Sequence, residues 1–110
     1  MLNVYYRAVR LVRLLMPTVH KIRRRNWELA DQIERALTSS PLNIAEGYGS
    51  YGGNKRQRYH TALGSTYEVY GGLDVAIAAG YIEQRDISPN ANLETHHIIG
   101  ALKSLTKSRR

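Results

Sequence analysis

The stretch SSPLNIAEGYG, residues 39–49, decides the fold. It places a proline inside an apolar helical pattern and follows it with Asn43, Glu46 and two glycines. Pro41 removes one backbone donor and its ring clashes with the preceding turn, which costs about 3 kcal/mol in a helix interior. The surrounding fold must therefore offset this cost.

On both sides of this stretch, apolar residues recur with the period of an α-helix, and no run is typical of a strand. The pattern predicts four helices, which cover residues 3–24, 27–47, 55–79 and 87–106. Short connections between them favour an all-α, antiparallel up-and-down four-helix bundle. We expect it to form a single domain over residues 1–110.

Local signals mark several helix ends. Asn26 is expected to cap the second helix, and Ser88 followed by Pro89 begins the fourth. Gly80 should end the third helix in the left-handed conformation. Residues 47–54, GYGSYGGN, are interpreted as the loop between the second and third helices.

Basic residues outnumber acidic ones by 16 to 9, for a formal net charge of +7. Residues 1–25 carry seven of them and no acidic residue: Arg7, Arg10, Arg13, Lys21, Arg23, Arg24 and Arg25. A second cluster and a basic tail follow: Lys55, Arg56 and Arg58, then Lys103, Lys107, Arg109 and Arg110. This asymmetry indicates a polyanionic partner, nucleic acid or an anionic membrane surface, with a merely solvated surface as the alternative.

Several classes of protein are disfavoured. The chain has no cysteine, so it has neither disulfides nor thiolate metal sites. No apolar run approaches the roughly 18 residues of a membrane span, and arginines interrupt any N-terminal signal sequence. We therefore expect a cytoplasmic protein without a membrane partner.

Three motifs in order resemble one known family: residues 39–47, then ALGSTYE at 62–68, then the Gly-Tyr pair at 80–81. The chain is similar to the four-helix-bundle family of the 23S ribosomal RNA intervening-sequence proteins. The matching positions are Gln32, Arg35, Ala36, Ser39, Pro41, Asn43, Ile44, Ala45, Glu46, Gly47, Ala62, Gly64, Ser65, Glu68, Gly80 and Tyr81. The resemblance implies a ring-shaped homo-oligomer, typically a pentamer. It also implies kinship with the accessory subunits of reverse transcriptases in diversity-generating retroelements, which bind RNA and the polymerase.

The motif residues are interpreted as structural. Pro41 frees the carbonyl of Leu37, which needs another partner if it is buried. We expect a polar network to satisfy such groups and to lock the helix pair or the protomer contact, built from Asn43, Glu46, Ser65 and Glu68 beside the glycines Gly47 and Gly64. Paired carboxylates can also serve acid–base catalysis or metal binding, but no nucleophile or histidine accompanies them by spacing.

A second glycine pattern bears on assembly. Gly64, Gly71 and Ala78 recur every seven residues along the third helix, and such a stripe lets another backbone approach closely. The alternative is a helix weakened by two glycines.

No enzyme, cofactor or metal site is predicted. GYGSYG at 47–52 has the spacing of a dinucleotide-binding loop but follows a helix, not a strand. Glu94 and His97 form a single Glu-x-x-His pair, whereas bundle di-iron sites need two. The four histidines have no zinc spacing.

We therefore predict a non-enzymatic RNA-binding scaffold that holds structured RNA by charge and shape. Tyr48 and Tyr51 could add stacking platforms beside the second basic cluster, whereas Tyr59, Tyr67 and Tyr70 are expected to pack in helix interfaces. The alternative is a protein-interaction scaffold, for instance an accessory subunit of a reverse transcriptase.

Overall fold

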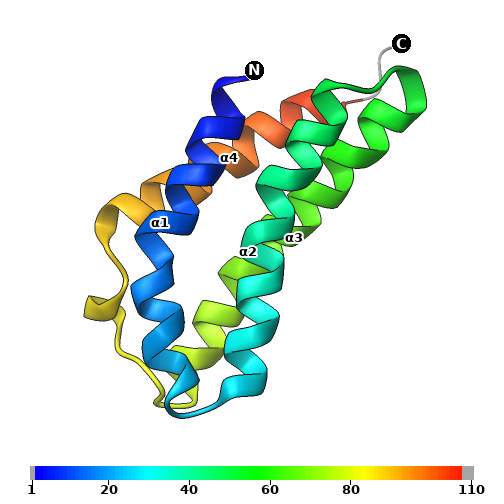
Figure 1. Cartoon of the computed structure of the whole chain (residues 1–110). Helices are drawn as coiled ribbons and strands as arrows, with labels where there is room; N and C mark the ends of the chain where they lie inside the picture. The colour runs from blue at the N-terminus through cyan, green and yellow to red at the C-terminus, as the bar shows by residue number, and fades with distance from the viewer. Residues whose placement is uncertain (1, 108–110) are drawn as a thin grey trace.

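The structure, a computed structural model, describes residues 2–107 (Figure 1). Within them it contains four α-helices and no strand: α1 (Asn3–Arg23), α2 (Trp27–Tyr48), α3 (Gly52–Ala78) and α4 (Pro89–Thr106). A short 3₁₀ turn, η1 (Gln84–Asp86), precedes α4. The predicted all-α, four-helix fold is confirmed.

The helices form an elongated bundle of about 45 × 24 × 23 Å. α2 packs on α1 and α3, and the shorter α4 packs on α1 and α3 at one end of the bundle. The segment between α3 and α4 runs beside the other half of α1 (Figure 1). The start of α1, the α2–α3 turn and the end of α4 therefore lie at the same end of the molecule.

The local signals act as predicted. The Asn26 side chain accepts a hydrogen bond from the backbone N–H of Leu29 at 3.0 Å, and Ser88 caps α4 in the same way. Gly80 has a φ of +80°, and the N–H of Tyr81 donates to the carbonyl of Ala76 at 2.9 Å. This i to i−5 bond is the mark of a left-handed helix end.

The loop predicted over residues 47–54 is present but too long in the prediction, because both helices extend into it and leave only residues 49–51 between them. α2 continues to Tyr48, and α3 already begins at Gly52. Backbone N–H groups of Gly49 and Lys55 make helical bonds here, to Ala45 at 3.2 Å and Tyr51 at 3.3 Å. A helical glycine costs only about 1 kcal/mol relative to alanine, so these backbone bonds prevail over its preference for a loop.

The α2/α3 interface is close because two glycines lie in it. A Cβ on Gly47 would stand 2.6 Å from a ring carbon of Tyr59, and one on Gly72 would stand 2.6 Å from Ile33. Both Tyr59 and Ile33 are buried. Side chains therefore pack directly on the facing backbone, which gives Gly47 of the opening stretch a definite packing role.

The opening stretch keeps its helix despite the proline. α2 runs unbroken through Pro41, whose ring is buried. Beside it, the buried hydroxyls of Ser40 and Thr66 form a hydrogen bond of 3.0 Å between α2 and α3. None of the helices in residues 2–107 is both long and apolar enough to cross a membrane.

Candidate nucleic-acid interface

The basic residues of α1 divide into two groups. Arg7 belongs to the first, because its guanidinium bonds one carboxylate oxygen of Glu94 on α4. The Glu94 side chain is only 8% exposed. Nε of Arg7 and the other oxygen of Glu94 are buried without a partner among residues 2–107. This ion pair holds α4 on α1, so Arg7 serves the fold.

Lys21 and Arg23 are paired as well. Nζ of Lys21 lies 2.7 Å from a carboxylate oxygen of Asp86, just before α4. The backbone N–H of Glu83 and, next, the ammonium of Lys21 hold the pKa of Asp86 below its usual range. The pKa of Arg23 is raised, chiefly by its 2.8 Å hydrogen bond to Asp31 on α2. Neutralising Asp86 or Asp31 would therefore weaken the contacts that Lys21 and Arg23 make within the bundle.

The second group is free of such contacts. Arg10, Arg13 and Arg24 are exposed, and within residues 2–107 none of them forms an ion pair or a side-chain hydrogen bond. Helical spacing places Arg10 and Arg13 on one outward stripe of α1 with the exposed His20, and Arg24, the residue that caps the end of α1, continues this stripe. Arg25 lies apart, with its guanidinium 5.7 Å from the ring centre of Tyr81.

The second basic cluster is only partly available. Arg58 pairs with Glu46 at 3.1 Å, whereas Lys55 and Arg56 make no ion pair among the described residues. These two side chains border a shallow depression of about 540 Å³ together with Lys107, the residue that follows α4. The N-terminus of α3 also lies here, and the side chain of its N-cap residue, Tyr51, accepts no hydrogen bond from it. Because its first backbone N–H groups have no such acceptor, they and the helix dipole add positive potential.

The polar network predicted for the motif is only partly formed. Ser65 donates to Ser39 at 2.9 Å, and Asn43 donates to the Ser39 carbonyl and hydroxyl, both at 3.0 Å. Glu46 and Glu68 do not take part, which corrects the prediction. Both side chains are exposed: Glu46 pairs instead with Arg58 of α3, and Glu68 makes no hydrogen bond or ion pair within residues 2–107.

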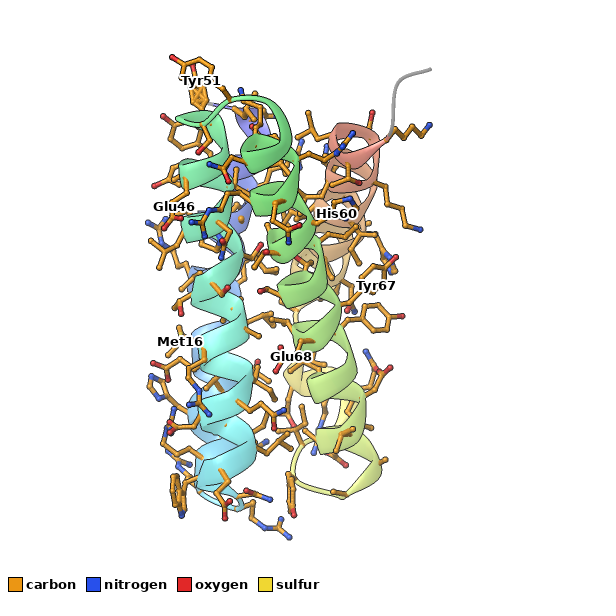
Figure 2. The ribbon with its side chains drawn as sticks, turned by 90° about the vertical axis from the view of Figure 1, so that its right-hand side faces the viewer. Met16, Glu46, Tyr51, His60, Tyr67 and Glu68 are labelled. Carbon is orange, nitrogen blue, oxygen red and sulfur yellow. The ribbon has the colours of Figure 1, made fainter. Side chains whose placement is uncertain are left out.

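Glu68 instead borders a groove between α2 and α3. Figure 2 shows it pointing into the space between the two helices, on the opposite side of α3 from Tyr67. The motif residues line a polar part of about 390 Å³: Gln32, Arg35, Ala36, Ser39, Ser65 and Glu68. An apolar part of about 370 Å³ continues beyond Glu68, past Leu29, Ile33 and Val75. Gly64 and Gly71 are exposed nearby, and a Cβ on either would meet nothing within 4 Å.

Two of these five tyrosines are more exposed than predicted. Tyr48 and Tyr51 are exposed, by 44% and 89%, and Tyr59 is buried as predicted. Tyr67 and Tyr70 were expected in helix interfaces but are 45% and 40% exposed. α4 is displaced toward one end of the bundle and covers these rings only in part, so the helical period alone could not place them.

Sequence reasoning missed what accompanies these rings. Lys103 lies with its ammonium 5.9 Å from the ring centre of Tyr67, and His96 meets Tyr70 edge to face at 5.7 Å. The available signal was the spacing of His96 and Lys103, seven residues apart on one face of α4. Arg109 and Arg110 of the basic tail lie outside the described residues. Within residues 2–107, no group of three or more histidine, aspartate or glutamate side chains could hold a metal ion.

Comparisons with known proteins agree with this architecture. The sequence model of the 23S rRNA-intervening sequence protein family matches residues 1–104. A crystal structure of a protein of unknown function from the S23 ribosomal protein family of Bacteroides thetaiotaomicron is similar, with a TM-score of 0.84. It shares 19% sequence identity, and the match covers 96% of this chain and 99% of that one. No curated protein matches the sequence.

Proposed function

Because the chain belongs to the 23S rRNA-intervening sequence protein family, we propose that it is a non-enzymatic scaffold that binds structured RNA. The observation that carries this proposal is the unpaired stripe of Arg10, Arg13 and Arg24 on α1. These guanidinium groups have no acidic partner among residues 2–107, so they are available to phosphates. Arginine suits this role because its planar fork matches two phosphate oxygens.

The geometry of the stripe fits a nucleic-acid backbone. A helix rises about 1.5 Å per residue, so Arg10 and Arg24 are about 20 Å apart along α1. Such a stripe can contact phosphates at two places along a nucleic-acid backbone without reading base edges. Binding by charge and shape is how proteins commonly recognise folded RNA.

Assembly into a ring-shaped homo-oligomer, for which we propose a pentamer, would repeat this surface. Gly64 and Gly71 support it, because open space lies where their side chains would be and a second backbone could approach there. A closed ring of +7 protomers would carry a strong positive potential. Light scattering of the purified protein measures the number of protomers directly.

A salt titration of RNA binding tests the proposal. Binding to a folded RNA hairpin should weaken steeply as salt rises, because each phosphate contact releases condensed counterions. Replacing Arg10, Arg13 and Arg24 by glutamate should abolish binding at moderate salt while helicity and oligomer size stay unchanged. The matched control replaces the same three residues by lysine, which keeps the charge and should keep the salt dependence.

Two outcomes count against the proposal. A flat salt dependence of the unaltered protein would exclude binding by phosphate contacts. Full binding by the glutamate variant would exclude the α1 stripe as the RNA surface, and would leave Lys55 and Arg56 as the cations to replace next.

The α2/α3 groove favours a second function, a protein-interaction scaffold such as an accessory subunit of a reverse transcriptase. Its apolar part beside an unpaired Glu68 suits a helix or peptide with an apolar stripe and one cation. Such binding would persist in high salt, unlike the RNA complex. Replacing Val75 by aspartate should weaken it and leave RNA binding unaltered.

A further inference from the structure

The α3/α4 face carries exposed aromatic rings next to cationic side chains. Tyr67 lies under the ammonium of Lys103, and Tyr70 is supported edge to face by His96. Figure 2 shows Tyr67 pointing away from α2, on the side of α3 where α4 lies. Both tyrosines remain close to half exposed, so their rings offer free surface.

A pocket of about 240 Å³ opens beside Tyr70 and His96. Its walls include three apolar side chains, Leu73, Ile77 and Ile87. Thr95 also lines it but donates its hydroxyl to the carbonyl of Ala91, whereas the side chains of Asp74, Gln84 and Asn92 have no hydrogen-bond partner among residues 2–107. The pocket is smaller than those of about 300–1,000 Å³ that hold drug-sized ligands, so one planar ring system suits it.

The chemistry of the pocket selects a base over a phosphate. The carboxylate of Asp74 repels phosphate but accepts hydrogen bonds from the amino or ring N–H groups of a base. The amides of Gln84 and Asn92 can each donate and accept, as a base edge requires. An aromatic face for stacking is supplied by Tyr70, and base–aromatic stacking is the usual means of holding an unpaired nucleotide.

Cations continue from the pocket toward the second basic cluster. Lys103 lies in the last turn of α4, and Lys107, the residue after this helix, borders the same depression as Lys55 and Arg56. A strand whose base enters the pocket could therefore lay its backbone along these four side chains. The positive charge lies where the phosphates would be, and the one carboxylate lies where the base would be.

We propose that the α3/α4 face binds an unpaired nucleotide of the RNA, with its base in the pocket against Tyr70 and a neighbouring base on Tyr67. The proposal rests on the RNA-binding function proposed above and narrows its substrate to structured RNA with a bulge, loop or single-stranded end. Lys103 contacts the phosphate that joins the two nucleotides. The paired parts of the RNA lie on the arginine stripe of α1.

The test compares two RNA hairpins that differ by one bulged nucleotide, 2-aminopurine. Binding should quench its fluorescence, because the base stacks on Tyr70. Replacing Tyr70 by leucine should remove the quenching and weaken the bulged hairpin about tenfold, with the fully paired hairpin unaffected. Replacing Tyr70 by phenylalanine should retain both signals, and so should the control Trp27→Leu, which removes an exposed ring on α2.

Replacing Asn92 by alanine gives a second pocket variant, at an exposed position where folding is not at risk. It should weaken the bulged hairpin alone. Equal binding of the two hairpins, with no effect of Tyr70→Leu or Asn92→Ala, would overturn this inference and leave the proposed function intact. Failure of both hairpins to bind the unaltered protein would overturn the proposed function and this site with it.

Discussion

The α2/α3 interface and the contacts that hold α4 are built differently. α2 and α3 meet through shape, where Tyr59 packs on Gly47 and Ile33 packs on Gly72. α4 and the segment before it bury apolar side chains such as Ile98 and Ile87, and in addition charge pairs, Arg7–Glu94 and Lys21–Asp86, join them to α1. One exposed ion pair, Arg58–Glu46, also joins α2 and α3, so the first interface should respond less to pH and salt than the second.

The family motif and the proposed RNA contacts also lie in different regions of the molecule. The family motif gathers at the close α2/α3 interface and its groove, with Ser39 and Ser65 bonded across it. The pocket with its exposed rings lies against α4. Close packing leaves little surface for a ligand, whereas an incompletely covered helix leaves rings and cations exposed. The motif thus identifies the fold, and the proposed RNA contacts lie on other faces.

The largest expected effect comes from the buried ion pair of α4. Replacing Arg7 by methionine leaves the carboxylate of Glu94 buried without a counterion, which should lower the free energy of unfolding by about 3 kcal/mol or more. Urea unfolding followed by circular dichroism measures the loss. Arg10→Met, three residues further along α1, is the matched control and should change stability little, because Arg10 is exposed and unpaired.

A variant that replaces both Arg7 and Glu94 tests whether the ion pair itself stabilises the fold or whether each charge only neutralises the other. Arg7 and Glu94 each leave one buried polar atom without a partner, so the pair is incompletely satisfied. Replacing both, by methionine and leucine, should restore at least the original stability. A double variant as unstable as Arg7→Met alone would mean that packing, not charge, holds α4 at this point.

The helix ends could be predicted from the sequence, whereas the Arg7–Glu94 pair could not. Asn26, Gly80 and Ser88 fix helix ends through bonds to residues at most five positions away, so their roles are readable without the fold. Arg7 and Arg10 are alike in sequence, and they differ only because α4 brings Glu94 to the first. That contact spans 87 residues, and no local pattern contains it.

In the candidate site, too, features that depend on local sequence could be predicted, and features that depend on helix packing could not. The basic clusters and the exposure of Tyr51 could be predicted, because they depend on composition and on a turn. The exposure of Tyr67 and Tyr70 could not, since it depends on how far α4 covers α3. Glu68 matches the family motif yet faces the groove, because a motif records which residues occur and not which side of the helix is covered.

A smaller loss is expected at the α2/α3 interface. Replacing Gly47 by alanine would place a Cβ against the buried ring of Tyr59, and overpacking of this kind costs about 1–3 kcal/mol. Thermal unfolding should show the loss equally at low and high salt. Gly100→Ala on α4 is the matched control: its Cβ meets nothing within 4 Å, so the free energy of unfolding should rise by about 0.5–1 kcal/mol. A loss that grows with salt would contradict the view that the contact between Gly47 and Tyr59 is one of shape.

The smallest effect concerns the charge before α4. The pKa of Asp86 is lowered by the Glu83 N–H and by Lys21, so the folded protein binds a proton there less readily than the unfolded chain. This contribution to stability is complete above the unfolded pKa of about 3.9, and it disappears as the pH falls through the lower folded pKa. The variant Asp86→Asn should therefore unfold at a lower temperature than the original protein at neutral pH, and this difference should shrink as the pH falls through the folded pKa. Lys21→Met should reduce the pH dependence without removing it, because the Glu83 N–H remains as a donor.

A deficit of Asp86→Asn that persists undiminished at low pH would assign the role of Asp86 to its shape, and would make the α4 contacts resemble the α2/α3 interface after all.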